Sequence, residues 1–416
     1  MTKPNESTTV VLPQTARQQV ICLAFESEAE YAKLVGAPKL YRAWLEAQYA
    51  RHPELFPAAF AQGFHWHSRY HQKKQNVTLR RLRLKATRGV FTIAPSFLLP
   101  YGAGRTDEVE KALYLLPYGV PAAALEYVFG RSASYYERLL ASVGRFHLVG
   151  TTVKQADQLP AQLVADEKIT WEAGQEVLLA TTVAQGCFLG TALASETSAA
   201  ALEIAYGEFK TEAQNLAPAY TPETVTTDGF RPTRLAWQNL FPQMTLILCF
   251  LHGLLKIAER CRGQLRQTVL DQAWRCYDAP TAASFAQRLR RFDEWAQAHL
   301  SGAVLELAQK LRTRRTDYQT AYAHPGAART TNAVDRLMNF QDRWLYARRY
   351  LHGQRGSSRL LVRAYALLWN FHPYSASLRR RDPTRQSPFA DLNGFQYHEN
   401  WCHNLLIAAS RGGVPA

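Results

Sequence analysis

Two aspartates stand at the ends of β-like runs in the middle of the chain. Asp166 follows the apolar run 163–165, and Asp228 follows the β-branched run 224–227. Carboxylates are the oxygen ligands that Mg²⁺ prefers, and two such ions about 4 Å apart can activate an attacking oxygen and stabilise a leaving one. Either aspartate alone could be a turn residue. Together they predict a site for Mg²⁺ or Mn²⁺ that performs phosphoryl transfer.

A third acidic ligand is expected on a helix beyond the last strand. Asp335 is the candidate, because Asn332 and Asp335 are i,i+3 neighbours that share one helix face, and Arg336 beside them can meet phosphate. An Asp-Arg pair on a basic helix can also be an ordinary surface ion pair. The competing third ligands are Glu259, Glu306 and Glu399.

The α/β part of the chain, residues 146–250, must position the two aspartates. Hydrophobic patterning predicts strands at 164–168, 176–183, 187–194, 224–227 and 244–249. Helices are expected at about 197–215 and 232–240, and residues 184–186 suit a hairpin turn. Three antiparallel strands, a helix, a strand, a helix and a strand follow the ribonuclease-H-like order. In that fold the first and fourth strands are neighbours, so Asp166 and Asp228 would face one cleft.

The composition favours a polyanionic partner. Lysine and arginine number 49 against 34 acidic residues, a formal net charge of +15. In the run 77–85, Arg80, Arg81 and Arg83 alternate with apolar residues and predict a strand with one cationic face. An ordinary solvated strand face is an equally good interpretation. Arginines within 288–291, 312–315 and 379–381 are further candidates to neutralise phosphate.

A helix-turn-helix is predicted within residues 106–145. One helix opens near Thr106; a second begins with Pro121 at its first position and ends at Gly130, and a third spans 133–143. The DNA-facing candidates near the start of the last helix are Arg131, Ser134, Tyr135 and Arg138.

Cysteine and histidine offer a second metal hypothesis. Cys249 and His252 could open a zinc site that Cys402 and His403 complete. The simpler interpretation is a buried cysteine and a histidine that support the carboxylate site. His65, His67 and His71 lie among aromatic and basic residues and are expected to face DNA or fill a core.

Five segments are expected from these patterns. They are a tail and helical segment (1–62), the basic strand with the helix-turn-helix (63–145), the core strands (146–250), an all-helical insertion (251–325) and a last helical region (326–416). Helices are predicted at 330–352 and 357–371, a loop at 375–388 and a final helix from 393. The six scattered cysteines form no CxxC pair, and no apolar run of 18 residues occurs, which predicts a reduced cytoplasmic protein without a membrane segment.

The chain resembles transposases of bacterial insertion sequences in the DDE class, in particular the Mutator-like branch. The segments that carry the resemblance are 165–168, 226–229, 249–252 and 332–336. It implies cleavage of double-stranded DNA at terminal inverted repeats and transfer of the freed 3′-hydroxyl strand into target DNA. It also implies Mg²⁺ or Mn²⁺ held by Asp166, Asp228 and Asp335, and a nucleoid-associated homo-oligomer. Most such enzymes carry glutamate at the third position, where this chain has aspartate.

Two alternatives stay open at this point. The chain could be a transposase-derived DNA-binding protein that keeps the fold and has lost cleavage. It could also be a ribonuclease-H-like nuclease without strand transfer.

Overall fold

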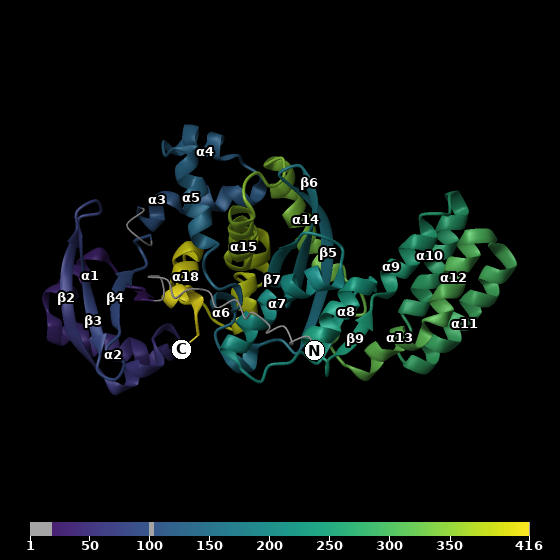
Figure 1. The fold of residues 1–416 in the computed structure, drawn as a ribbon, viewed down its shortest axis with the longest axis horizontal. Coiled ribbons are helices and arrows are strands. Elements are labelled where there is room, and N and C mark those ends of the chain that lie inside the picture. The colour runs from purple at the N-terminus through teal and green to yellow at the C-terminus, as the bar shows by residue number, and fades with distance from the viewer. Residues whose placement is uncertain (1–18, 100–103, 416) are drawn as a thin grey trace, which may run out of the picture. The chain divides into compact units, whose positions relative to one another are not determined.

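The computed structural model describes residues 19–99 and 104–415. They form two compact units (Figure 1). The first contains the chain up to Val109 together with Tyr397 onward, and the second is Glu110–Gln396. The boundary falls within helix α3, Thr106–Leu115. Most of the expected N-terminal tail lies outside the described residues. Among those described, no helix is both long and apolar enough to cross a bilayer.

The first unit is built on a four-stranded sheet in the order β1-β4-β3-β2. Strand β1 is parallel to β4, and β3 is antiparallel to both β4 and β2. Its elements are β1 Val20–Leu23, α1 Glu28–Gly36, α2 Pro38–Arg51, β2 Phe64–Gln72, β3 Val77–Leu84, β4 Val90–Pro95 and α18 Trp401–Ala408. Helices α1 and α2 lie in the segment 1–62 that was expected to be helical, and β3 matches the strand expected at 77–85. Strands β1, β2 and β4 were not expected.

The second unit contains a five-stranded sheet in the order β7-β6-β5-β8-β9. The first three strands in sequence are antiparallel, and β5, β8 and β9 are parallel to one another. The bounds are β5 Gln162–Glu172, β6 Gln175–Ala184, β7 Cys187–Ala194, β8 Thr224–Thr227 and β9 Thr245–Leu248. All five predicted strands are observed, and β5 is longer than expected. Gln185 and Gly186 both have positive φ, as a two-residue type I′ hairpin turn requires.

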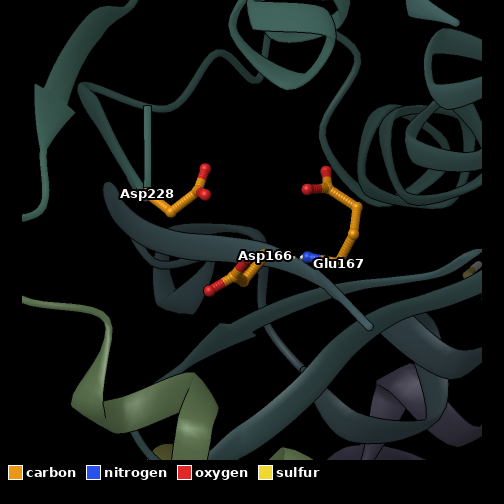
Figure 2. Close-up of side chains that lie close together, drawn as sticks. All are labelled: Asp166, Glu167 and Asp228. Atoms are coloured by element: carbon orange, nitrogen blue, oxygen red, sulfur yellow. Dashed lines mark hydrogen bonds between the residues drawn. The ribbon is translucent and has the colours of Figure 1, made fainter. Parts of the chain in front are cut away.

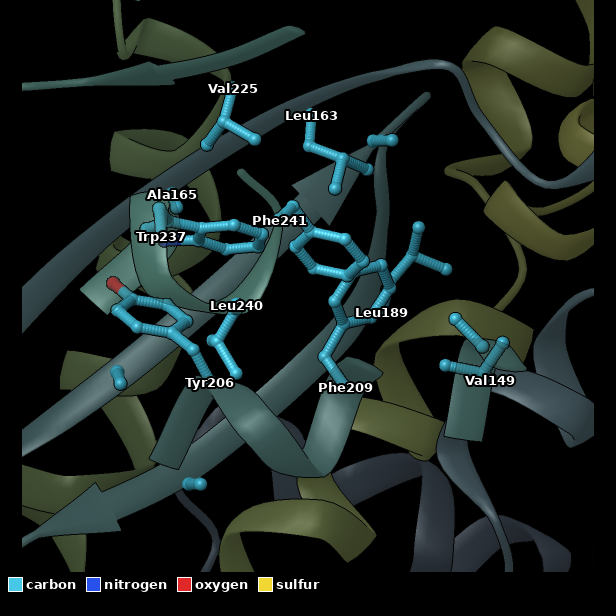
Figure 3. Packing of buried hydrophobic residues seen from close by; sticks show 14 of the residues in the cluster. Val149, Leu163, Ala165, Leu189, Tyr206, Phe209, Val225, Trp237, Leu240 and Phe241 are labelled. Atoms are coloured by element: carbon cyan, nitrogen blue, oxygen red, sulfur yellow. The ribbon is translucent and has the colours of Figure 1, made fainter. Parts of the chain in front are cut away.

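One face of this sheet is covered by α7 Ala199–Leu216 and α8 Arg231–Leu240. Their aromatic residues Phe209 and Trp237 pack into the same core as Leu163 and Ala165 of the sheet (Figure 3). Ser198 accepts a hydrogen bond from Ala201 N at the start of α7, which fixes where this helix begins.

The opposite face carries α14 Asn332–Ala347 and α15 Arg355–Phe371. Gln341 Nε2 of α14 donates to Thr181 Oγ1 of β6 at 3.1 Å, and Phe340 lies against Phe188 of β7. Because successive side chains of a strand point to opposite faces, neighbouring residues of β5 meet different helical layers.

The expected helix pair is formed by α4 Ala122–Phe129 and α5 Ala133–Val143. Gly130 ends α4 in the left-handed conformation, as predicted, whereas Pro121 is the N-cap rather than the first helical residue. Helix α5 packs against α15, where a β-carbon on Gly144 would overlap the Leu360 carbonyl. Arg348 adds two hydrogen bonds of 2.7 Å to the Glu137 carboxylate. A short helix, α6 Leu148–Thr152, leads into the sheet.

The segment predicted as a helical insertion is helical and has a core of its own, which includes Phe285 and Tyr318. It consists of α9 Phe250–Ala258, α10 Gly263–Tyr277, α11 Ala282–His299, α12 Gly302–Thr313 and α13 Arg315–Gln319. The helices predicted at 330–352 and 357–371 are observed as α14 and α15. The expected loop at 375–388 contains the short helix α16 Ala376–Arg381. The final helix expected from 393 is α18, which begins only at Trp401, because α17 Pro388–Asn393 ends at Gly394 with positive φ.

Candidate active site

The candidate site lies where β8 stops beside β5. The two strands pair only over Gln162–Val164 of β5, and β8 ends at Thr227 while β5 continues to Glu172. In the described part of the chain no strand pairs with this edge of β5 beyond Val164, and Leu351 forms an isolated bridge there with Glu172. Asp228 follows β8 at that edge, so the fold brings it to Asp166, as predicted from the two strand ends.

Three carboxylates gather at this open edge. Asp166, Glu167 and Asp228 each offer an oxygen, and these oxygens all lie within 4.8 Å of one another (Figure 2). Among the described residues, no other group of three or more acidic, histidine or cysteine side chains is arranged to hold a metal. Asp166 and Glu167 leave β5 on opposite sides, and the Glu167 carboxylate projects on the side of Asp228. Glu167 was missed because strand alternation places it on the other face from Asp166.

Glu167 is fixed by the two helices that cover its face of the sheet. Its Oε1 accepts hydrogen bonds from the Tyr206 hydroxyl of α7 at 2.5 Å and from the Thr233 hydroxyl of α8 at 2.7 Å. Burial raises the pKa of Glu167 to about 7, although these two hydrogen bonds oppose the shift. Both bonds go to one oxygen, which leaves Oε2 to face a cation.

Asp166 is more buried and is surrounded by like charge. Burial, and then the neighbouring Asp228 and Glu167 carboxylates, raise the pKa of Asp166 to about 7. Its Oδ1 accepts the Glu167 backbone N–H at 2.9 Å, which sets the orientation of the side chain. Such crowding of buried negative charge is relieved by bound protons or by a divalent cation.

The turn after β8 fixes Asp228. Its Oδ1 accepts the Phe230 N–H at 2.7 Å, directly before α8 begins. Gly229 between them has φ +89°, and a β-carbon there would overlap Leu248. Asp228 therefore has the turn role that Asp-Gly suggested, and it also belongs to the carboxylate group.

Cys249 and His252 join the end of β9 to the start of α14. His252 Nδ1 lies 3.4 Å from Cys249 Sγ and 3.2 Å from Thr331 Oγ1, and Thr331 N donates to Cys249 Sγ at 3.2 Å. The Cys249 hydrogen bond is the largest cause that raises the pKa of His252 to about 9, and the charges of Asp166 and Asp228 add to it.

The other two residues of the zinc alternative, Cys402 and His403, lie in the first unit. There His403 contacts Ser96 Oγ at 3.0 Å and Asp107 Oδ1 at 3.1 Å. The four proposed zinc ligands are not among the groups arranged for a metal in the described chain.

Asp335 lies in the first turn of α14, outside the group of three carboxylates. Lys168 of β5 pairs with Asp342, and Leu351 bridges Glu172, so α14 runs in the same direction as β5. Asp335 precedes Asp342 by two helical turns, or about 10 Å. The charge of His252 acts on both Asp335 and Asp166. Burial raises the pKa of Asp335, and the charges of His252 and Lys168 oppose that shift.

The other third-ligand candidates are not part of the group. Glu259 and Glu306 are exposed on the helical insertion, and Glu399 belongs to the first unit. Asn332 and Arg336, which flank Asp335 on α14, are both exposed.

The residues predicted to contact DNA differ in how far their side chains are exposed to solvent. Arg80 is 8% exposed and donates from Nε to the Val35 carbonyl at 2.7 Å, so its place on a cationic outer face was wrong. Arg81 and Arg83 are partly exposed, and the Arg81 guanidinium lies 4.6 Å from the centre of the Tyr70 ring. Along β2, His65, His67 and His71 are exposed.

The helix-pair candidates gather around the start of α5. Arg131, Ser134 and Arg138 are exposed, and Tyr135 is partly buried with the Arg131 guanidinium 5.5 Å from its ring. Arg138 donates to the Ser134 hydroxyl at 3.4 Å. This face of α5 is opposite the buried Tyr136 and Leu140.

Comparison with protein-family models and with curated proteins finds no match to this chain.

Proposed function

We propose that this chain is a DNA transposase of the DDE class with a ribonuclease-H-like catalytic core. It would cleave DNA at the terminal inverted repeats of its element and join the freed 3′-hydroxyl strand to target DNA. The observation that carries the proposal is the group Asp166, Glu167 and Asp228 at the open edge between two neighbouring parallel strands.

The arrangement around this group supports the same assignment. The sheet order β7-β6-β5-β8-β9 corresponds to strands 3-2-1-4-5 of the core, with helices on both faces. The helical insertion follows the fifth strand, and the chain returns to the sheet as α14 with Asp335 in its first turn. Thr226 Oγ1 of β8 donates to the Ala328 carbonyl at 2.6 Å, which ties the returning segment to the site.

The donor set fits Mg²⁺ or Mn²⁺. All three clustered side chains are carboxylates, which offer the oxygen ligands that hard divalent cations prefer. Burial raises the pKa of two of them, Asp166 and Glu167. When bound, such ions lower the pKa of an attacking water and offset charge on a leaving oxygen. Asp166 and Asp228 would hold the cation, with Glu167 or Asp335 completing the set.

The surrounding side chains hold these ligands in place. Tyr206 and Thr233 orient Glu167, while the Phe230 N–H orients Asp228. The Cys249 hydrogen bond raises the pKa of His252 to about 9, which favours its protonated form. Its positive charge would offset part of the negative charge of the group and attract an incoming phosphate. DNA would be bound by exposed basic residues such as Arg81, Arg83 and Arg138.

The decisive experiment is cleavage of a DNA duplex that carries the flanking ends of the gene, with Mn²⁺. Asp166→Asn and Asp228→Asn should each lose at least about 100-fold in cleavage rate and keep DNA affinity. Glu167→Gln and Asp335→Asn, measured in parallel, show which of them is the third ligand. A target-joining assay on the same products separates a transposase from a nuclease. If the wild type binds these ends and never cuts them, the chain is a DNA-binding protein and the proposal fails.

A further inference from the structure

We propose that Arg314, which the helical insertion carries, binds the scissile phosphate of the DNA at the carboxylate group. This inference rests on the proposed function and adds a residue from outside the sheet to the reaction. It assigns to the insertion a direct contact with the substrate.

The position of Gly229 locates Arg314 at the site. A β-carbon on Gly229 would lie 3.7 Å from Arg314 Nη1, although the two residues are far apart in sequence. Gly229 follows Asp228 directly, and its positive φ and its contact with Leu248 both require glycine. The guanidinium therefore lies beside the turn that presents Asp228.

The insertion holds Arg314 there through its own core. Arg314 stands between α12 and α13, where the chain changes direction. Tyr318, one turn later, is buried among the residues that form this core, and its ring lies 5.2 Å from that of Phe250. Arg314 is exposed, and its side chain interacts with Tyr318 through its charge and a hydrogen bond. This contact links the arginine to the packed core of the insertion.

Arg314 differs from the nearby Arg312 in its lack of an acidic partner among the described residues. Arg312 lies 3.5 Å from Asp293 within the insertion, so its charge is already compensated. Among the described residues no carboxylate forms an ion pair with Arg314. A guanidinium presents two parallel N–H donors that match two phosphate oxygens, and here they would approach from the side of Asp228.

The test compares the full-length protein with Arg314→Gln, Arg314→Lys and Arg266→Gln. Arg266 is an exposed arginine of α10 in the same insertion and serves as the matched control. Three quantities are measured for each: Mn²⁺ affinity, affinity of the Mn²⁺-loaded protein for the dinucleotide TpT, and cleavage rate of the DNA ends. Arg314→Gln should keep Mn²⁺ affinity, lose about tenfold in TpT affinity and cleave roughly 100-fold more slowly. Arg314→Lys should recover part of the rate, and Arg266→Gln should match the wild type.

The outcomes separate this inference from the proposed function. If Arg314→Gln cleaves within threefold of the wild type, Arg314 does not contact the scissile phosphate and the transposase proposal stands. If the wild type does not cleave, and Arg314→Gln still loses TpT affinity at unchanged Mn²⁺ affinity, the phosphate contact stands and the proposed activity falls. If the wild type does not bind Mn²⁺, both fail.

Discussion

Asp166 and Glu167 are adjacent in sequence and reach one group of carboxylates from opposite sides of β5. Ordinary strand alternation would separate them. They converge because β8 ends early, so the three carboxylates meet at the strand edge and not over either face. Both acidic residues are visible in the sequence. Glu167 can join the carboxylate group only because β8 ends before β5 does. The point where β8 ends depends on tertiary packing, which the sequence pattern does not reveal.

The buried carboxylates predict an unusual dependence of stability on pH. The pKa of Asp166 rises from 3.8 in the unfolded chain to about 7 in the fold, and that of Glu167 rises from 4.5 to about 7. Between about pH 4 and 7 the native state therefore holds protons that the unfolded state has released. Without metal, stability should fall as pH rises through this window.

Asp166→Asn should remove part of this penalty. In the presence of a chelator at pH 8, we expect the variant to unfold at a temperature a few degrees higher than the wild type, about 1–2 kcal/mol more stable. Mn²⁺ should stabilise the wild type and not the variant. Calorimetry at pH 5 and pH 8 measures both effects. His252 loses its own stabilising contribution between pH 6.5 and about 9, so variants must be compared with wild type at each pH. A variant less stable than wild type at pH 8 without metal would contradict the prediction.

Substitutions of the adjacent residues Arg80 and Arg81 should have opposite effects on stability and on DNA binding. Successive strand residues point to opposite faces, so the two could never have formed the single cationic face that the sequence suggested. Arg80→Met should cost about 1–3 kcal/mol, because the Val35 carbonyl loses its donor, and should leave DNA affinity unchanged.

Arg81→Met should leave stability nearly unchanged and weaken DNA binding. If Arg81 meets one phosphate, the slope of log affinity against log salt should fall by about 0.9. Fluorescence anisotropy across a series of NaCl concentrations, with urea unfolding of the same variants, measures both properties. If Arg80→Met and Arg81→Met changed DNA affinity equally, the face of β3 that carries Arg81 would not be part of the DNA interface.

At the scale of elements, local patterns predicted the second unit better than the first. Strands β6 and β7 have long apolar runs and a two-residue turn, so each segment carries its own signal. Strand β1 has only four residues, and its partner β4 lies far along the chain, with Val20 opposite Thr92. Strand β2 is an edge strand with mostly exposed polar residues, so the alternation that reveals a half-buried strand is missing.

The close contact between α5 and α15 depends on glycine at position 144. Gly144→Ala would drive a methyl group into the Leu360 carbonyl, which should separate these helices and cost about 1–3 kcal/mol. Gly207→Ala, within α7, is the matched control. Its β-carbon would have only an ordinary contact of 3.8 Å with Leu240, so alanine should stabilise the helix by about 0.5–1 kcal/mol. Urea unfolding of both variants checks the opposite signs, and a stable Gly144→Ala protein would show that α5 is loosely held.

At the scale of the whole molecule, the second unit is inserted between two parts of the first. The chain returns at Tyr397, and Ser410 joins the first unit by accepting the Cys22 N–H at 3.1 Å and donating to the Leu55 carbonyl at 2.8 Å. The sequence predicted one helical region over 326–416. It held no signal for this return, because the contacts join residues from opposite ends of the chain.

Because of this organisation, we expect the second unit to keep the proposed metal site by itself. The carboxylate group, the helix pair and the insertion all lie within Glu110–Gln396. A fragment of residues 104–396, which retains all of α3, should unfold cooperatively and gain the same stabilisation from Mn²⁺ as the full chain. The same fragment with Asp166→Asn should gain none. Its DNA affinity should be lower because Arg81 and Arg83 are absent, and the salt dependence should weaken with it. A folded fragment that Mn²⁺ fails to stabilise would show that the site needs residues of the first unit.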